Sequence, residues 1–329
     1  MYNSNGLDPE SLSLFKKNII PASLKKGDTV ALIAPGSPIK PEKFQIAIAN
    51  IESLGLVPKY TDTVFKKYGY LAGIDQERLD DFHQMVSDPT VKAIWCLRGG
   101  YGCTRLLHQL DFNLIKNNPK IIIGYSDITA LLIAIYQKTK IVGFHGPVAI
   151  SDYFTTYSKL NIENILFKRE VDSFKIWYQP QTDPKYKDHN FIINHGKASG
   201  RLTGGNLSLL VNLPGTEFAP RYKGKLVFIE DVGEKPYRID RMLTYLLAAT
   251  DLKDAAGIIL GIFVDCESKD DDSLSLQQVL MDRLSILGVP CFYGFTFGHV
   301  RDICTFPLGI DAQMDTSDMS VTLLEQAVK

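Results

Sequence analysis

Ser126, Glu230 and His299 each stand at or shortly past the end of an apolar run typical of a buried strand. Sites in α/β proteins gather at the carboxyl ends of strands. A serine hydroxyl needs a neighbouring imidazole to accept its proton, and the imidazole needs a carboxylate to fix its tautomer. These residue types therefore predict a catalytic triad, although their order along the chain does not prove that they meet.

Ser126 lies in a tight turn between the apolar run 121–124 and a helical run that starts at Ile128. This is the arrangement of a nucleophile elbow, in which the hydroxyl is pushed outward and the next N–H, from Asp127, faces the developing oxyanion. The alternative is that Ser126 or Asp127 merely caps the helix, because both are good cap residues.

Glu230 and His299 also have plainer interpretations. Glu230 could pair with a nearby lysine or arginine as a solvated charge, and His299 could be an ordinary loop histidine. His145 is a rival for the role of base, because it too ends a predicted strand. The spacing alone does not decide between these alternatives.

A glycine-rich segment, Arg98-Gly99-Gly100-Tyr101-Gly102, follows another predicted strand. Glycines at such a place let the backbone approach a ligand closely. The loop could supply a second oxyanion donor or a phosphate nest, but it lacks the P-loop lysine and the Gly-x-Gly-x-x-Gly pattern. Arg98 could hold a substrate carboxylate through a bidentate pair, or it could form an internal salt bridge.

Alternating strands and helices must position these residues in the first half of the chain. Connections between them are mostly short, which predicts a doubly wound, flavodoxin-like parallel sheet with the site at its carboxyl edge. The expected strands cover 29–34, 57–60, 91–96, 121–124 and 141–144, and the expected helices cover 41–54, 75–86, 104–110 and 128–137.

The second half predicts another α/β domain. A glycine-rich turn at 200–205 leads into a helix, and three apolar runs and two amphipathic runs follow. Residues between the two halves show little periodicity. We therefore expect an extension (1–21), an N-terminal domain with the nucleophile (22–150), a linker (151–199) and a C-terminal domain with Glu230 and His299 (200–329), with the active site at the junction.

Composition indicates an ordinary globular protein. The 329 residues are 45% hydrophobic and carry a net charge of -1 without a basic stripe, so we expect no nucleic acid partner. No apolar stretch has the length of a signal peptide or membrane span, which predicts a cytoplasmic protein. The five cysteines form no Cys-x-x-Cys pair, so neither a zinc site nor a disulfide framework is expected.

Six segments in a fixed order resemble a known family. They are Asp28-Thr29-Val30-Ala31-Leu32-Ile33-Ala34-Pro35, Arg98-Gly99-Gly100-Tyr101-Gly102, Gly124-Tyr125-Ser126-Asp127, Gly204-Gly205-Asn206, Glu230 with Asp240-Arg241, and Gly298-His299 with Pro307-Leu308-Gly309. Together they resemble the LD-carboxypeptidases of the S66 serine peptidase class. The resemblance covers about residues 22–325.

The resemblance implies a serine peptidase triad. Ser126 would be the nucleophile, His299 the general base and then acid, and Glu230 the residue that orients His299. Backbone N–H groups of Gly100 and Asp127 would form the oxyanion hole.

The resemblance also implies the reaction. The family releases terminal D-alanine from cytoplasmic murein tetrapeptides during peptidoglycan recycling, often as a homodimer, without a metal or organic cofactor. We expect Arg98, Tyr101 and Asn206 to contact the substrate, with Arg98 reading the D-alanine carboxylate.

Two other functions stay open at this stage. A related branch, the microcin C immunity peptidases, cleaves a peptidyl-nucleotide conjugate and uses a loop tryptophan to stack on the nucleobase. Only Trp177 could play that part, since Trp95 lies inside a predicted strand. A different class would be a non-catalytic protein that binds a nucleotide or phosphate through the 99–102 loop.

Overall fold

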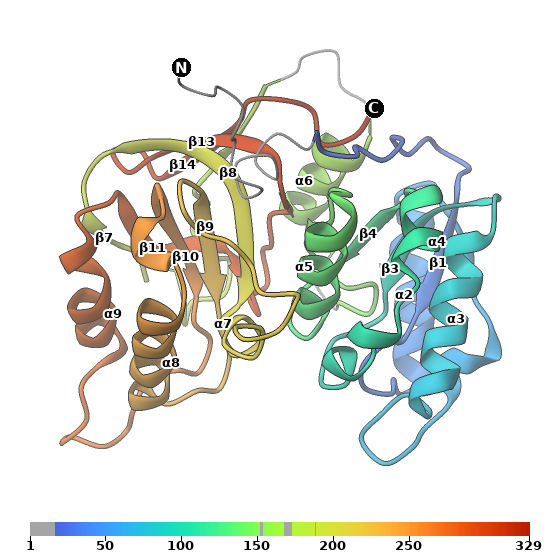
Figure 1. Ribbon diagram of the computed structural model, residues 1–329, viewed down its shortest axis with the longest axis horizontal. Coiled ribbons are helices and arrows are strands. Elements are labelled where there is room, and N and C mark those ends of the chain that lie inside the picture. The colour runs from blue at the N-terminus through green and yellow to red at the C-terminus, as the bar shows by residue number, and fades with distance from the viewer. Residues whose placement is uncertain (1–16, 152–153, 168–172, 188) are drawn as a thin grey trace, which may run out of the picture.

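Two sheets lie side by side in the computed structural model, with α5 (Ile128–Thr139) between them (Figure 1). The structure describes residues 17–151, 154–167, 173–187 and 189–329, so most of the extension expected over 1–21 lies outside the described residues. Among the helices in these ranges, none is both long and apolar enough to cross a membrane.

The N-terminal sheet has the predicted flavodoxin-like order, β2-β1-β3-β4-β5, and its neighbouring strands are parallel. A sixth strand from near the C-terminus, β12, pairs antiparallel with β5 and completes the sheet. The strands are β1 (Thr29–Ile33), β2 (Val57–Lys59), β3 (Val91–Cys96), β4 (Ile121–Gly124), β5 (Phe144–His145) and β12 (Phe306–Pro307). The inner strands are almost wholly buried because helices cover both faces, which explains their unbroken apolar runs.

Helices α2 (Pro41–Ser53), α3 (Asp75–Ser87) and α4 (Phe112–Asn117) complete this half. α5 differs from them because ten of its twelve residues are buried, as expected of a helix enclosed by two sheets. The helix predicted over 104–110 is wrong. Two separate 3₁₀ turns, Cys103–Arg105 and Leu107–Gln109, occupy it, because its backbone hydrogen bonds join residues three apart, such as Leu106 to Cys103 and Gln109 to Leu106.

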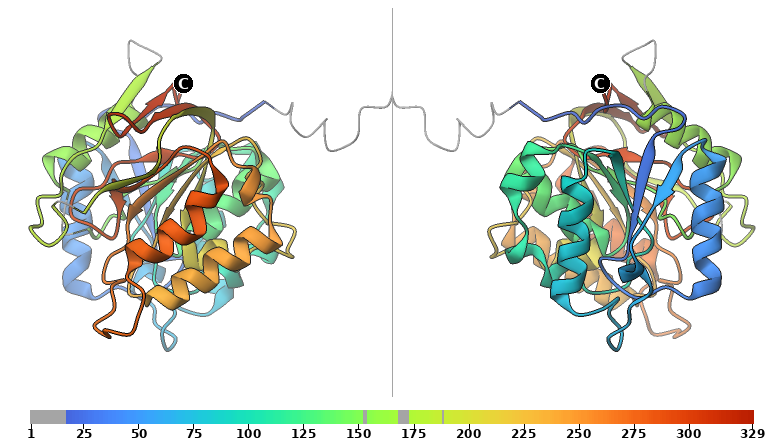
Figure 2. Two further views of the ribbon diagram at one scale, coloured as in Figure 1. Left: turned by 90° about the vertical axis from the view of Figure 1, so that its left-hand side faces the viewer. Right: turned by 90° about the vertical axis from the view of Figure 1, so that its right-hand side faces the viewer.

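The C-terminal sheet has the order β6-β14-β13-β8-β9-β10-β11-β7. Its four inner strands, β8 to β11, are parallel, and the outer pairings are antiparallel. Helices α8 (Pro236–Ala249) and α9 (Leu276–Leu284) lie side by side on one face (Figures 1 and 2). The strands are β6 (Phe174–Trp177), β7 (Phe191–Asn194), β8 (Lys197–Asn206), β9 (Leu226–Glu230), β10 (Gly257–Ile262), β11 (Cys291–Gly298), β13 (Asp311–Asp315) and β14 (Ser320–Leu323).

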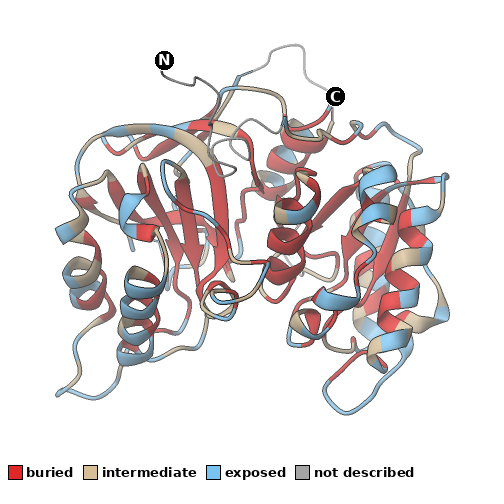
Figure 3. Cartoon of the chain, in the orientation of Figure 1, coloured by how far each residue is buried: buried red, intermediate tan, exposed pale blue. Residues whose placement is uncertain are grey.

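The segment 151–199 holds more regular structure than its weak periodicity suggests. It contains α6 (Thr156–Leu166), and its strands β6 and β7 form opposite edges of the C-terminal sheet. Edge strands are short and only half covered (Figure 3), so their hydrophobic pattern is weak. The glycine-rich turn predicted at 200–205 is also wrong, because these residues belong to β8.

The glycines at the end of β8 let this strand meet α5. Gly205 has a φ of +141°, and a Cβ built there would lie 2.5 Å from the side chain of Thr129. The next N–H, from Asn206, donates to Thr129 Oγ1 at 3.0 Å. The close approach requires glycine, and together with the β12–β5 pairing it joins the two sheets at their carboxyl edges.

Replacing Gly205 with alanine should therefore destabilise the protein by forcing a methyl group into Thr129. Gly215→Ala is the matched control, because Gly215 also has a positive φ, +86°, but nothing within 4 Å of its Cβ position. We expect Gly205→Ala to lose about 1–3 kcal/mol more than the control in urea-unfolding experiments. Equal losses in the two variants would show that the contact with Thr129 is not tight.

Candidate active site

Ser126 occupies a strained turn between β4 and α5. Its φ is +63°, a left-handed conformation that non-glycine residues rarely adopt and that collects at functional sites. Asp127 does not cap α5 through its side chain, since its carboxylate instead accepts a hydrogen bond from the N–H of Cys103 at 2.9 Å. The geometry therefore favours the nucleophile elbow over the capping interpretation.

His299 and Glu230 form a hydrogen-bonded ion pair at the carboxyl edge of the C-terminal sheet. Nδ1 of His299 lies 2.8 Å from Oε2 of Glu230, whose side chain is 0% exposed, while that of His299 is 20% exposed. β9 ends at Glu230 and β11 ends just before His299, with β10 between them. Because the carboxylate holds the Nδ1 side of the ring, Nε2 is the nitrogen left to accept a proton.

The electrostatics of this pair suit a base and its orienting acid. Burial lowers the pKa of His299, but the charge and hydrogen bond of Glu230 outweigh that effect and raise it above the ordinary histidine value. Burial likewise raises the pKa of Glu230, but His299 pulls it below its usual range. Glu230 is therefore ionised whenever His299 is protonated.

The segment that carries Ser126 contacts His299 across the two sheets. The ring of Tyr125, the residue before Ser126, meets the ring of His299 edge-on with centroids 4.8 Å apart. Within the described part of the chain, the Ser126 hydroxyl makes no hydrogen bond to His299. Hydrogen bonds of this kind are often long without substrate and tighten in the complex, so the absence of this bond does not exclude Ser126 and His299 as partners.

The glycine loop passes directly over the nucleophile. A Cβ built on Gly99 would lie 2.9 Å from the N–H nitrogen of Asp127 and 3.2 Å from Oγ of Ser126. The absent side chain leaves space for a substrate carbonyl beside both groups. Gly100, the other predicted oxyanion residue, has a φ of +91° and packs against Ser37. The structure thus brings the predicted loop, the elbow and the Asp127 N–H together.

Ser37 and Arg78, which the sequence did not single out, hold this loop in place. Ser37 donates its N–H to the carbonyl of Gly99 at 3.0 Å, and its Oγ accepts from the N–H of Tyr101 at 3.1 Å. The fully buried guanidinium of Arg78 donates to the carbonyls of Gly102 and Pro35. No local pattern marks Arg78, because the charged residues of α3 do not differ in type between buried positions, such as Arg78 and Asp81, and exposed ones, such as Asp80.

The same contacts argue against a phosphate nest in the 99–102 loop. The N–H groups of Tyr101 and Cys103 already donate to Ser37 and Asp127. The Asp127 carboxyl group is buried beneath the loop, and this burial raises its pKa. A phosphate group would therefore meet few free donors and an acidic side chain.

The three predicted substrate-binding residues differ in how much of their hydrogen-bonding capacity is already used within the protein. Arg98 is half-buried and donates to the carbonyl of Pro38 at 3.2 Å, and among the described residues no carboxylate pairs with it. Tyr101 is largely exposed beside the loop. Asn206 is buried with both ends of its amide bonded, to Asp231 and to the N–H of Leu209.

Asp231 is a buried acid that sequence reasoning missed. It accepts hydrogen bonds from Asn206, from the N–H and hydroxyl of Ser208, and from the N–H of Val232. Burial, with the charge of Glu230 beside it, raises its pKa to about 6. These contacts fix the end of β9, and so the position of Glu230.

His145, the rival base, lies beneath the site. It is fully buried among the rings of Tyr125, Phe228 and Phe297, and neither ring nitrogen has a hydrogen-bond partner among the described residues. Burial lowers its pKa to about 4, against the opposing charge of Glu230. A neutral histidine closed off from substrate does not fit the role of base, so the geometry favours His299.

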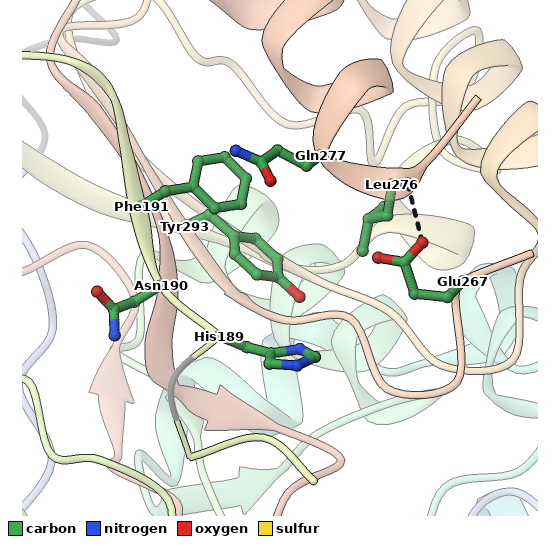
Figure 4. Close-up of a pocket in the computed structure, with 7 residues that line it drawn as sticks. All are labelled: His189, Asn190, Phe191, Glu267, Leu276, Gln277 and Tyr293. Atoms are coloured by element: carbon green, nitrogen blue, oxygen red, sulfur yellow. Dashed lines mark hydrogen bonds between the residues drawn. The ribbon is translucent and has the colours of Figure 1, made fainter.

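A separate hollow of about 310 Å³ lies beside β7 and β11 (Figure 4). The stacked rings of Phe191 and Tyr293, 4.9 Å apart, form one side, and the Glu267 carboxylate on the other side accepts from the N–H of Leu276. None of Ser126, Glu230 and His299 lines it. The hollow is therefore distinct from the candidate catalytic centre.

Trp177, the candidate for nucleobase stacking, lies on the edge strand β6. Its ring is covered by the Lys175 ammonium, 3.8 Å from the centroid, and Lys175 in turn pairs with Asp318. β6 is separated from β9, which carries Glu230, by three strands. This placement does not favour a nucleobase platform at the active site.

Comparisons with known proteins agree with this architecture. The model of the LD-carboxypeptidase N-terminal domain matches residues 30–146, and that of the LD-carboxypeptidase C-terminal domain matches residues 199–314. A probable murein peptide carboxypeptidase of Bacillus subtilis is 42% identical over 314 residues, covering 94% of this chain and 96% of the relative.

Two solved structures are also similar over nearly the whole chain. A muramoyltetrapeptide carboxypeptidase from Oxalobacter formigenes is 29% identical, with a TM-score of 0.77 and coverage of 90% of this chain and 97% of the other. The immunity protein MccF in complex with glutamyl sulfamoyl guanosine is 26% identical, with a TM-score of 0.85 and coverage of 94% and 99%.

The raised pKa of His299 predicts the acidic limb of the pH–rate profile. A base must be neutral to accept a proton, so kcat/KM should fall as the pH is lowered through a value above about 6.5, the ordinary histidine pKa. In Glu230→Gln the charge that raises this pKa is gone, so the limb should shift to lower pH while kcat drops. A limb that stays in place in Glu230→Gln would mean that another group titrates there.

Gly99→Ala should abolish most activity and also lower the stability somewhat, because its Cβ would lie 2.9 Å from the backbone nitrogen of Asp127. The added methyl group would occupy the space beside the Asp127 N–H and the Ser126 hydroxyl. Loss of one oxyanion donor costs about 10²–10³-fold in kcat in other serine hydrolases, and we expect a decrease of that order. Thermal unfolding of the same sample separates this effect from misfolding, and near-normal kcat in a folded variant would contradict the assignment.

Proposed function

The chain belongs to the LD-carboxypeptidase family and is a serine-type carboxypeptidase, and from that premise we propose that it releases the terminal D-alanine of murein tetrapeptides through Ser126, His299 and Glu230. The observation that carries the proposal is the ion pair of His299 and the buried Glu230, which faces a strained serine beneath an open glycine loop. A neutral Nε2, a buried carboxylate and backbone donors are the parts that acyl transfer requires.

In the proposed reaction, Ser126 Oγ attacks the carbonyl carbon that precedes the terminal D-alanine, and His299 Nε2 takes the hydroxyl proton. N–H groups of Asp127 and Gly100 stabilise the tetrahedral oxyanion. The imidazolium then protonates the amine of D-alanine as the C–N bond breaks. Water then attacks the ester carbonyl as His299 takes its proton, and His299 gives that proton to Ser126 Oγ as the acyl–Oγ bond breaks.

Arg98 is our candidate for reading the terminal carboxylate. Its guanidinium has no carboxylate partner among the described residues and keeps donors available beyond its bond to Pro38. Its charge also acts on Tyr125, which contacts His299. A carboxypeptidase needs such a cation close to the scissile bond, because the bond lies only one residue from the free carboxylate.

The relatives support the choice of substrate. One is named a probable murein peptide carboxypeptidase and another a muramoyltetrapeptide carboxypeptidase. The likeness to MccF supports an alternative substrate, an aminoacyl-nucleotide conjugate, but the place of Trp177 on a distant edge strand does not. We also propose a cytoplasmic homodimer, which rests on the family resemblance.

Mass spectrometry of the purified protein with a murein tetrapeptide tests the proposal directly. The wild type should remove one D-alanine. Ser126→Ala should lose several orders of magnitude in kcat, as other triad serines do. Near-normal turnover by Ser126→Ala would refute the proposed nucleophile. Cleavage of glutamyl sulfamoyl guanosine with no D-alanine release would select the conjugate-cleaving function instead.

A substrate pair tests the role of Arg98. We expect Arg98→Ala to lose about 10- to 100-fold in kcat/KM on a tetrapeptide with a free terminal carboxylate, since hydrogen bonds to charged groups are worth about 1.5–3 kcal/mol. The same peptide with an amidated terminus is the control, and the variant should lose little on it. If Arg98→Ala still discriminates between the two peptides as the wild type does, another residue reads the carboxylate.

A further inference from the structure

Two tyrosines form an exposed pair at the glycine loop, 99–102, which contains one of them. Tyr70 is 65% exposed and Tyr101 48% exposed, and their ring centroids lie 5.7 Å apart at a tilt of 57°. Large aromatic rings in solvent lose apolar burial that they would gain elsewhere in the fold. Aromatic groups gathered next to a site are typical of a surface that a ligand covers.

The fold presents this pair rigidly. Tyr70 lies in a tight turn closed by reciprocal backbone hydrogen bonds between Tyr68 and Leu71, at 2.8 and 3.0 Å. The buried side chain of Leu71 anchors the turn, and the N–H of Ala72 ties it to the carbonyl of Gly36 at 3.0 Å. Rigid aromatic side chains bind ligands at a low cost in conformational entropy.

Polar groups surround the two rings. Arg105 lies close enough to interact electrostatically with both tyrosine hydroxyls, and Asp75 fixes its guanidinium through hydrogen bonds of 2.8 to 3.0 Å. The Arg105 side chain stays 41% exposed. Apolar ring faces bordered by fixed hydrogen-bonding groups match a sugar, whose pyranose ring has an apolar C–H face and a rim of hydroxyls.

The distance from the nucleophile also fits. Gly99 contacts Ser126, and Tyr101 follows two residues later, at most about 7 Å along the main chain. The ring of Tyr70 lies a further 5.7 Å away. In a muramoyl tetrapeptide cut before its last residue, three residues separate the sugar from the scissile bond, and they span about 10 Å when extended.

We propose that Tyr70 and Tyr101, with Arg105 at their edge, form a saccharide subsite that binds the muramoyl group of the substrate. The inference rests on the proposed function and extends it, because it makes the sugar a determinant of specificity. Tyr70 belongs to the loop between β2 and α3, which projects from the bottom of the N-terminal half (Figure 1).

The test compares a muramoyl tetrapeptide with the free tetrapeptide. The wild type should show the higher kcat/KM on the sugar-bearing substrate, through a lower KM. In the double variant Tyr70→Ala/Tyr101→Ala this preference should fall about ten-fold, towards equal use of both substrates, because both ring faces that stack on the sugar are lost. The variant Tyr70→Phe/Tyr101→Phe keeps the ring faces and should restore most of the preference.

Tyr245→Ala serves as the matched control, because Tyr245 is an exposed tyrosine on α8 in the other half of the protein. It should leave the preference unchanged. The subsite is refuted if the wild type shows no preference, or if the double alanine variant keeps it or loses equally on both substrates. Failure of the wild type to release D-alanine from either substrate would instead refute the proposed function.

Discussion

Ser126, the proposed nucleophile, and His299, its proposed base, belong to different sheets, so the proposed chemistry depends on how firmly the two sheets are joined. Ser126 follows β4 of the N-terminal sheet, whereas His299 and Glu230 end β11 and β9 of the C-terminal sheet. Three contacts fix the junction. Gly205 brings β8 against Thr129 on α5, β12 returns to pair with β5, and the ring of His145 packs against Phe228 and Phe297 from the other sheet. An error of about 1 Å in this packing would be enough to separate a serine from its base.

Burial of the neighbouring helix α5 offsets the cost of the left-handed conformation at Ser126. A left-handed non-glycine residue costs of order 1–3 kcal/mol. α5 begins two residues later and buries ten of its twelve residues, among them Leu131, Leu132 and Ile133. Because each fully buried side chain of this size contributes about 1.5–3 kcal/mol, two or three of them offset the strain. The same helix that packs between the two sheets thus also holds Ser126 in its half-buried turn.

Local patterns predicted much of this fold, and interactions between distant segments account for the rest. β1, β3 and β4 were predictable because they are buried on both faces, and the ends of β4, β9 and β11 marked Ser126, Glu230 and His299 as candidates. The choice between His299 and His145 needed the tertiary fold, because both follow strands and only burial separates them. The strands of 151–199 and the end of β8 were missed for a related reason. β6 and β7 are exposed at the edges of the sheet, and the glycines that end β8 are set by the close approach of this strand to α5. Arg78 and Asp231 gave no signal, because a buried charge is recognisable only from its partners.

At the end of β9, two adjacent buried acids lower the folding stability at neutral pH. Glu230 and Asp231 are adjacent buried acids at the end of β9, and their pKa values move in opposite directions. Glu230 gains a cationic partner in His299, whereas Asp231 has only neutral donors and a pKa of about 6.

The pKa of Asp231 in the folded state is raised above the unfolded value near 3.9, so the folded state binds a proton more tightly than the unfolded chain does. This favourable contribution is present at low pH and is lost as the pH rises through about 6, where Asp231 ionises beside Glu230. The cost at neutral pH is of the order of 3 kcal/mol, about 1.4 kcal/mol for each pKa unit. The structural role of Asp231 explains why both acids are present despite this cost. Asp231 holds Ser208 and Asn206 in place at the end of β9, from which Glu230 reaches His299.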